Sequence, residues 1–296
     1  MGRECALVGF RKRRVSRGLS SPRSRPLALT VGIGVLWVTL GGCAAVGTPG
    51  ANNRQAVIDR IVAASAKVTV EQGGRRITSG SGVVVASKAA GSGIEAVSYV
   101  LTAAHILENK DGAKVFVRFT GAYATRGKLA ATVPRRGSPE TLDLALLQVS
   151  GVSVPPVSFP AEDRVRVGEE ILVVGFPWGK RLGLFSGIVS QVPGDGKEDV
   201  PADDEAEQSI VVDASSSRGV SGGGVFREET GSLVGVVEGY QTASIAVKDR
   251  AQTYSVKVPM PGETFVVPIG RIRRFLGEAG IGEASGMSGK IENPGE

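Results

Sequence analysis

Residues 215–226 hold a serine among glycines and lead into an apolar run, and they read Ser-Ser-Ser-Arg-Gly-Val-Ser-Gly-Gly-Gly-Val-Phe. Glycine adopts positive φ angles without strain and allows another chain segment to approach closely. A nucleophilic serine needs both properties, because neighbouring backbone N–H groups must point at the oxyanion that forms during acyl transfer. A flexible surface loop has the same composition, so the interpretation of this stretch depends on the rest of the chain.

The order of the residues separates two kinds of serine enzyme. Residues 219–223 match the G-x-S-x-G elbow of α/β-hydrolases, in which the histidine follows the nucleophile, whereas chymotrypsin-like proteases have histidine first, then the acid, then serine. The chain contains one histidine, His105, which lies 116 residues before Ser221. The elbow is therefore excluded, and any Ser–His pair in this chain consists of Ser221 and His105.

Two further stretches supply candidate partners for the serine. His105 follows an apolar strand-like run, and its ordinary pKa near 6.5 suits a general base, although a lone histidine is more often a surface or core residue. Asp143 opens the apolar run 144–149, where an unpaired carboxylate would be costly to bury. A histidine N–H is one partner that would satisfy it. Alternatively, Asp143 ends the preceding loop in water.

Taken together, three segments resemble the signatures of chymotrypsin-fold serine proteases, in the same order: Thr102-Ala103-Ala104-His105, Asp143-Leu144-Ala145-Leu146-Leu147 and Gly219-Val220-Ser221-Gly222-Gly223. Other segments resemble the bacterial HtrA/Deg-like branch, namely residues 80–84, 168–179, 187–190, 212–214 and 265–269. The resemblance runs from about residue 56 to residue 277.

The strand pattern predicts the fold class. Short alternating strands separated by turns from residue 67 onward favour an all-β sandwich or barrel, after a segment with helical spacing at 56–64. The resemblance implies a protease domain at 56–277 with two six-stranded antiparallel β-barrels, at about 66–150 and 165–270. It also implies a short N-terminal helix, a C-terminal helix at 271–276 and a site in the cleft between the barrels.

The resemblance assigns a role to each site residue. Ser221 attacks a peptide carbonyl, His105 accepts and returns the proton, and Asp143 orients the histidine. The backbone N–H groups of Gly219 and Ser221 form the oxyanion hole. Ser215 lines the specificity pocket, where an uncharged hydroxyl predicts a preference for small or medium apolar side chains over Lys or Arg.

Three positions around the serine depart from the HtrA pattern. Arg218 stands where proline is usual, Val220 where Asn or Asp is usual, and Gly224 where proline or alanine is usual. They support an alternative in which a weak or inactive protease fold binds peptides, in its cleft or by strand addition to residues 233–237, treated as an apolar edge strand. A purely structural lipoprotein would leave the His–Asp–Ser set unexplained. The complete set favours a serine endopeptidase.

The first 42 residues predict a signal peptide of the lipoprotein type. They hold eight Lys and Arg residues, and the apolar run 27–40 has the length of a signal h-region. Leu40-Gly41-Gly42-Cys43 resembles a bacterial lipobox, so Cys43 is expected to carry lipid, with an ordinary secretion signal as the alternative. Residues 43–55 are expected to form a flexible tether. This predicts anchoring in the bacterial cell envelope, at the outer membrane facing the periplasm where two membranes exist.

Removal of the signal changes the charge argument. The whole chain has a net charge of +6, but residues 43–296 keep 27 basic and 28 acidic residues, a net charge of −1, which argues against nucleic-acid binding. Cys5 would leave with the signal and Cys43 would carry lipid, so no disulfide is expected. One histidine makes a zinc site improbable, and no cofactor or metal is expected.

The expected partners are protein or peptide substrates and a membrane, and the oligomeric state stays open. Residues 194–207 form an acidic insertion, interpreted as a solvated loop. Residues 278–296 are rich in Gly, Ser and Glu and are expected to be a disordered tail, too short for a PDZ domain.

Overall fold

The structure, a computed structural model, describes residues 49–108, 112–193, 209–249 and 252–282. Its strands form two closed antiparallel barrels, so the prediction of an all-β fold with two six-stranded barrels is confirmed. The first barrel has the order β1-β2-β3-β6-β5-β4. Its strands are β1 (Ser65–Gln72), β2 (Arg75–Lys88), β3 (Val97–Thr102), β4 (Lys114–Phe119), β5 (Leu129–Arg136) and β6 (Ala145–Ser150).

The second barrel has the order β10-β11-β12-β9-β8-β7. Its strands are β7 (Glu170–Gly175), β8 (Gly183–Gln191), β9 (Ile210–Asp213), β10 (Gly224–Arg227), β11 (Leu233–Asp249) and β12 (Gln252–Pro268). Short 3-10 turns lie at η1 (Ala104–Leu107), η2 (Gly121–Arg126) and η3 (Pro177–Gly179). The two α-helices of the described ranges are α1 (Pro49–Ala63) and α2 (Ile269–Glu278).

The two barrels share apolar packing. In β1 the alternating residues Val68 and Val70 are buried, as the period of a strand requires. One buried cluster joins Leu147 of the first barrel to Leu172 and Phe226 of the second. A site supported by both barrels is therefore held on packed strands rather than on a linker.

Helix α1 begins earlier than the sequence suggested. It starts at Pro49, inside the range 43–55 that was expected to be a flexible tether, and residues 43–48 lie outside the described ranges. Proline is favourable in the first turn of a helix. Val57 and Ile61 are buried, and Arg54 pairs with Glu228 at 2.5 Å, so docking against the second barrel extends the helix. The expected C-terminal helix is present as α2.

The interpretation of residues 233–237 as an edge strand is wrong. This part of β11 pairs with β10 on one side and with β12 on the other. Leu233, Val236 and Val237 are fully buried. A continuous apolar run is typical of a strand with neighbours on both sides, and strand addition there is prevented by the existing partners.

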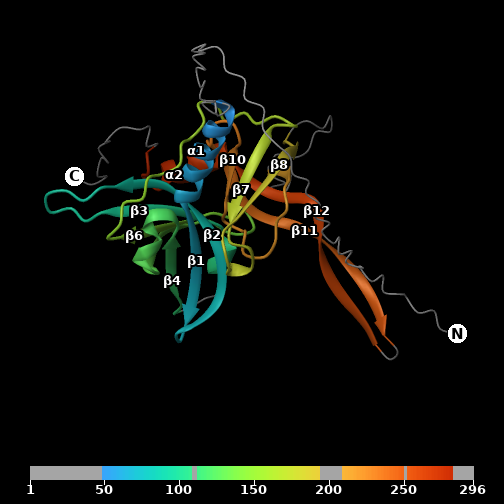
Figure 1. Cartoon of the computed structure of the whole chain (residues 1–296). Coiled ribbons are helices and arrows are strands. Elements are labelled where there is room, and N and C mark those ends of the chain that lie inside the picture. Colours follow the sequence, from blue (N-terminus) through green and yellow to red (C-terminus); the bar gives the residue numbers. More distant parts are fainter. Residues whose placement is uncertain (1–48, 109–111, 194–208, 250–251, 283–296) are drawn as a thin grey trace, which may run out of the picture. The chain divides into compact units, whose positions relative to one another are not determined.

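The distal parts of β11 and β12 form a ribbon that projects from the second barrel (Figure 1). Beyond Tyr240 and before Thr264, these strands pair with each other and with no other strand of the described residues. Directly opposed residues share a face, so one face of the ribbon is apolar. Its cross-strand pairs are Ala243 with Val258, Ile245 with Val256, and Val247 with Tyr254. Both Ile245 and Tyr254 are about half exposed.

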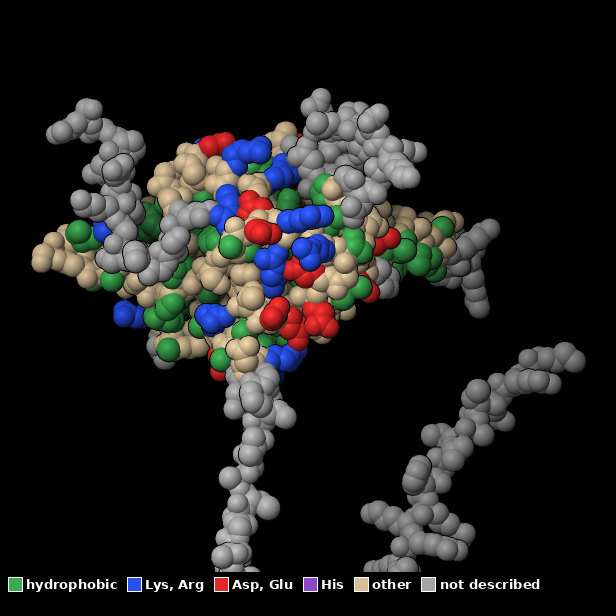
Figure 2. Space-filling view, turned by 90° about the horizontal axis from the view of Figure 1, so that it is seen from above, with side chains coloured by type: hydrophobic (Ala, Val, Ile, Leu, Met, Phe, Trp, Pro, Cys, Tyr) green, Lys and Arg blue, Asp and Glu red, His purple; other side chains and the backbone are tan. Residues whose placement is uncertain are grey.

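Acidic and basic side chains are mixed on the face shown in Figure 2. Opposite charges also pair between distant segments, as in the 2.6 Å contact between Lys128 and Glu71. That face therefore offers no uniformly basic surface. Among the helices of the described ranges, none has the length and apolar content needed to cross a membrane.

Candidate active site

The chain around His105 is anchored on both sides of the ring. Strand β3 ends at Thr102, and η1 begins two residues later. Ala103 and Ala104 are fully buried before the histidine, and Ile106 is buried after it. The imidazole itself is 39% exposed. Small residues thus fix the backbone in the barrel wall while the ring remains accessible.

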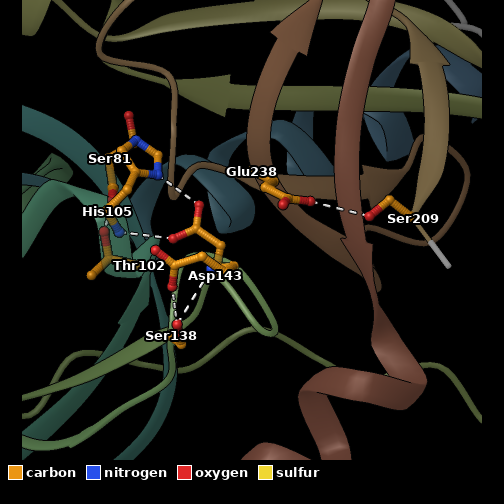
Figure 3. Close-up of polar contacts among 8 residues, drawn as sticks. Ser81, Thr102, His105, Ser138, Asp143, Ser209 and Glu238 are labelled. Atoms are coloured by element: carbon orange, nitrogen blue, oxygen red, sulfur yellow. Dashed lines mark hydrogen bonds and ion pairs between the residues drawn. The ribbon is translucent and has the colours of Figure 1, made fainter. Parts of the chain in front are cut away.

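Asp143 holds the histidine in two ways. Its Oδ2 lies 2.6 Å from Nδ1 of His105, and its Oδ1 accepts a 2.8 Å hydrogen bond from the backbone N–H of the same residue (Figure 3). The carboxylate is 4% exposed, so the alternative in which it ends a loop in water is wrong. Because Nδ1 faces Asp143, the other ring nitrogen, Nε2, is the one available to accept a proton from elsewhere.

The surroundings raise the pKa of His105 above its ordinary value of 6.5. Burial acts in the opposite direction and would lower this pKa. The hydrogen bond and charge of Asp143, together with the charges of Glu238 and Glu108, outweigh burial. Glu238 lies on β11 in the second barrel and accepts a hydrogen bond of 3.1 Å from Ser209. Both barrels therefore set the basicity of this ring.

The serine loop, residues 217–223, lies against the first barrel beside the histidine. Gly222 has φ +81°, and a Cβ there would lie 2.3 Å from the Ser81 carbonyl oxygen and 2.9 Å from the Ala103 nitrogen. Only glycine fits such a contact. Val220 is fully buried in the core of the second barrel, so this departure from the HtrA pattern anchors the loop. Among the described residues, the Ser221 hydroxyl makes no hydrogen bond, to His105 or to any other group.

Two backbone N–H groups of the serine loop are left without acceptors. In the described part of the chain, no hydrogen bond uses the N–H of Gly219 or of Ser221. The carbonyl of Arg218 accepts a 2.5 Å hydrogen bond from Trp178. A trans peptide points its carbonyl and its N–H in opposite directions, so the Gly219 N–H points away from Trp178. Two available donors beside a serine are the elements of an oxyanion hole.

The remaining predicted site residues fall into two groups. Ser215 is exposed and follows the end of β9. Cys43 and the acidic insertion 194–207 lie outside the described residues.

Sequence reasoning missed three residues near the site, Ser81, Glu238 and Ser216. The hydroxyl of Ser216 is buried and unpartnered in the described part of the chain. The described residues contain no group of three or more acidic, His or Cys side chains placed to hold a metal ion.

Comparison with known proteins agrees with this geometry. The family model described as "Trypsin-like peptidase domain" matches residues 80–236. A probable periplasmic serine endoprotease, DegP-like, of Pseudomonas putida is 32% identical over 157 residues, covering 53% of this chain and 28% of the relative. A probable periplasmic serine protease do/HhoA-like of Haemophilus influenzae is 31% identical over 159 residues, covering 53% and 30%. The chain thus matches less than a third of the length of either relative.

Two solved structures share the fold. A serine endoprotease from Yersinia pestis superposes with a TM-score of 0.55 at 18% identity, covering 76% of this chain and 66% of that one. A variant of the HtrA-type protease AlgW with a tripeptide gives a TM-score of 0.55 at 21% identity, covering 77% and 63%. At these identities the likeness concerns the fold alone.

Proposed function

We infer, since the chain belongs to the trypsin-like peptidase family, that it is a serine endopeptidase of the HtrA type that uses His105, Asp143 and Ser221. The observation that carries this proposal is the two-point attachment of His105 to Asp143 beside the serine loop. A carboxylate that bonds both the ring and the backbone of a histidine fixes the tautomer and the orientation that a general base needs.

The proposed reaction is acyl transfer through the serine. Ser221 Oγ attacks the carbonyl carbon of a peptide while Nε2 of His105 accepts the hydroxyl proton. The carbonyl oxygen becomes an oxyanion that the N–H groups of Gly219 and Ser221 face. His105 then gives the proton to the leaving amine, the C–N bond breaks, and an acyl-enzyme remains. Water, deprotonated by the same histidine, hydrolyses the ester and restores the serine.

The Asp143 contact gives the charged histidine its stabilisation. When Nε2 accepts the proton, the imidazolium forms 2.6 Å from a buried carboxylate. The raised pKa of His105 reflects the same preference for the charged ring. Each donor of the oxyanion hole is expected to lower the barrier by about 3 kcal/mol.

We propose that Ser215 forms part of the specificity pocket. Its position at the end of β9, six residues before Ser221, supports this role. An uncharged hydroxyl there favours small or medium apolar side chains before the scissile bond. The check is a peptide panel that differs only at that position, and the fastest cleavage after Arg or Lys would contradict the proposal.

We also propose that the protein is anchored in the cell envelope by lipid on Cys43 and acts on envelope proteins. The motif Leu40-Gly41-Gly42-Cys43 and the description of the relatives as periplasmic support this. Incorporation of a labelled fatty acid in bacteria tests it. The label should be lost in Cys43→Ser and kept in Cys5→Ser, and a label that survives Cys43→Ser would contradict the anchor.

A fluorophosphonate probe on the full-length chain tests the catalytic proposal. The wild type is expected to react, and Ser221→Ala and His105→Ala are each expected to abolish the reaction. Ser217→Ala is the matched control, because its hydroxyl makes no hydrogen bond among the described residues and the variant removes a serine from the same loop. A folded wild type that stays unlabelled, or labelling that survives Ser221→Ala, would contradict the proposal.

A further inference from the structure

We propose that Ser81, on β2 of the first barrel, is a positioning residue that holds the serine loop of the second barrel with its two free N–H groups facing the substrate. The inference rests on the proposed function, and it concerns a residue that makes no hydrogen bond to His105 among the described residues. Ser81 acts through the carbonyl groups of Gly219 and Ser221.

Every polar group of Ser81 is used, and most connect the two barrels. Its backbone N–H donates to the Ser221 carbonyl at 2.8 Å, and its hydroxyl donates to the Gly219 carbonyl at 2.7 Å. The same hydroxyl accepts a 2.8 Å hydrogen bond from the N–H of Phe176, which follows β7. Its own carbonyl accepts from the Thr102 hydroxyl at 2.6 Å, which ties Ser81 to the strand that leads to the histidine.

These contacts fix the peptide planes that adjoin those of the oxyanion donors. A peptide group is planar and trans, so a bonded carbonyl determines where the adjoining N–H points. The Gly219 N–H belongs to the peptide whose Arg218 carbonyl is held by Trp178, and the Ser221 N–H to the peptide whose Val220 carbonyl accepts from Gly223 at 2.8 Å. Ser81 holds the carbonyls of Gly219 and Ser221, so it fixes the 219–220 and 221–222 peptides, which lie on either side of the Ser221 donor. With the carbonyls of residues 218–221 all bonded to the protein, the N–H groups of Gly219 and Ser221 keep no acceptor in the described part of the chain.

Gly219 gives the serine loop a backbone with few intrinsic restraints. Gly219 has φ +94°, and a Cβ there would lie 2.5 Å from the Phe176 carbonyl oxygen. Glycine at this position removes the steric barrier that would otherwise restrict the peptide. The hydroxyl of Ser81, which is 1% exposed, supplies the missing restraint. Without it, the Phe176 N–H is buried without an acceptor and the part-buried Gly219 carbonyl loses its donor, which is costly. Rotation of the 219–220 peptide relieves the second loss and displaces the adjoining peptides, which carry the Gly219 and Ser221 N–H groups.

A second buried serine offers a matched control. Ser98 lies on β3 of the same barrel and is fully buried. Its hydroxyl also accepts one backbone hydrogen bond, from Val154 at 2.9 Å, and donates one, to Val152 at 2.9 Å. Ser81→Ala and Ser98→Ala therefore remove the same atoms and the same number of bonds, but only Ser81 is bonded to the serine loop.

The test compares both variants in the full-length chain. Thermal unfolding is expected to shift by a similar amount in each. With a fluorophosphonate probe, Ser81→Ala is expected to lower the maximal labelling rate about 10- to 100-fold, because small misplacements of catalytic groups have effects of this order. The probe concentration that gives half of the maximal rate should stay unchanged. Ser98→Ala should stay within about twofold of the wild type. The labelling rate of Ser81→Cys, whose thiol is a weak hydrogen-bond donor, should lie between the rates of Ser81→Ala and the wild type.

Amide hydrogen exchange provides a readout that does not require activity. Ser81→Ala should accelerate exchange about tenfold in peptides covering 176–178 and 217–223, where Trp178, Val220 and Gly223 donate backbone bonds, and Ser98→Ala should not. Unchanged exchange there, or an equal loss of labelling in both alanine variants, would overturn the proposal. If Ser81→Ala showed faster amide exchange but the wild type never reacted with the fluorophosphonate, the restraint of the loop by Ser81 would be supported and the proposed endopeptidase activity refuted.

Discussion

The close contacts at Gly222 predict how much the substitution Gly222→Ala lowers the free energy of unfolding. Gly73, in the turn between β1 and β2, is its control, because it also has a positive φ (+58°) but nothing within 4 Å of an added Cβ. Both alanine variants incur the left-handed backbone penalty of about 1–2 kcal/mol. At Gly222 the Cβ also meets the Ser81 carbonyl oxygen at 2.3 Å and the Thr102 hydroxyl at 2.4 Å. Neither can retreat, because both belong to buried strands of the first barrel.

The additional overlap adds an overpacking cost of about 1–3 kcal/mol. Gly222→Ala should therefore lower the free energy of unfolding by about 2–5 kcal/mol, against about 1–2 kcal/mol for Gly73→Ala. Urea unfolding measures both values, and equal m-values would show that the two transitions are comparable.

Reactivity gives a second, independent expectation for the same pair. The Gly222→Ala loop must move away from the first barrel and takes Ser221 with it, so labelling by a fluorophosphonate should fall sharply under conditions where the variant is folded. Gly73→Ala should react as the wild type does. If Gly222→Ala and Gly73→Ala had free energies of unfolding within about 1 kcal/mol of each other and reacted equally with the probe, the inferred contact of the loop with the first barrel would be refuted.

Two other predictions concern pH and the docking of α1. The labelling rate should rise with pH around a midpoint above 6.5, since only neutral His105 accepts a proton and its pKa is raised. Glu238→Gln removes a charge that raises this pKa and should move the midpoint to lower pH. Glu162→Gln, at an exposed position, should leave the midpoint unchanged. A midpoint that is unchanged in Glu238→Gln would contradict the assignment. Ile61→Ala should destabilise the fold by about 2–5 kcal/mol, because Ile61 is 1% exposed. Arg54→Ala, which breaks a half-exposed ion pair, should cost less than about 1 kcal/mol in the same unfolding experiment.

The all-β class could be predicted from local strand patterns, whereas the two six-stranded barrels and the pairing of His105 with Asp143 were implied by the resemblance. Alternating and apolar strands mark the barrels, and a lone carboxylate at the start of a buried run demands a partner. That argument left a histidine partner and a loop end in water as alternatives, and the structure places Asp143 Oδ2 2.6 Å from Nδ1 of His105. The role of Ser221 stays a prediction, because its hydroxyl makes no hydrogen bond to His105 within the described ranges.

The contacts of Ser81 and Glu238 depend on how the two barrels pack. Ser81 lies 138 residues from Gly219 in the chain, and the Gly-Ser-Gly sequence around it reads only as the opening of a strand. Glu238 follows a buried run in β11, and nothing local shows that its charge acts on a histidine of the other barrel. The error at residues 233–237 has the same origin, since a strand's neighbours are chosen by topology rather than by its own residues.

The β11–β12 ribbon has a consequence for how this scaffold can change. Since its distal strands pair with no other strand in the part of the chain that the structure describes, residues can be added or removed there in opposed pairs without breaking a ladder of the barrel. Exposed segments that lie outside the packed core tolerate insertion best. The ribbon is thus a module that divergence or protein engineering can lengthen, trim or exchange, while the strands at its base, which carry Glu238, keep their register.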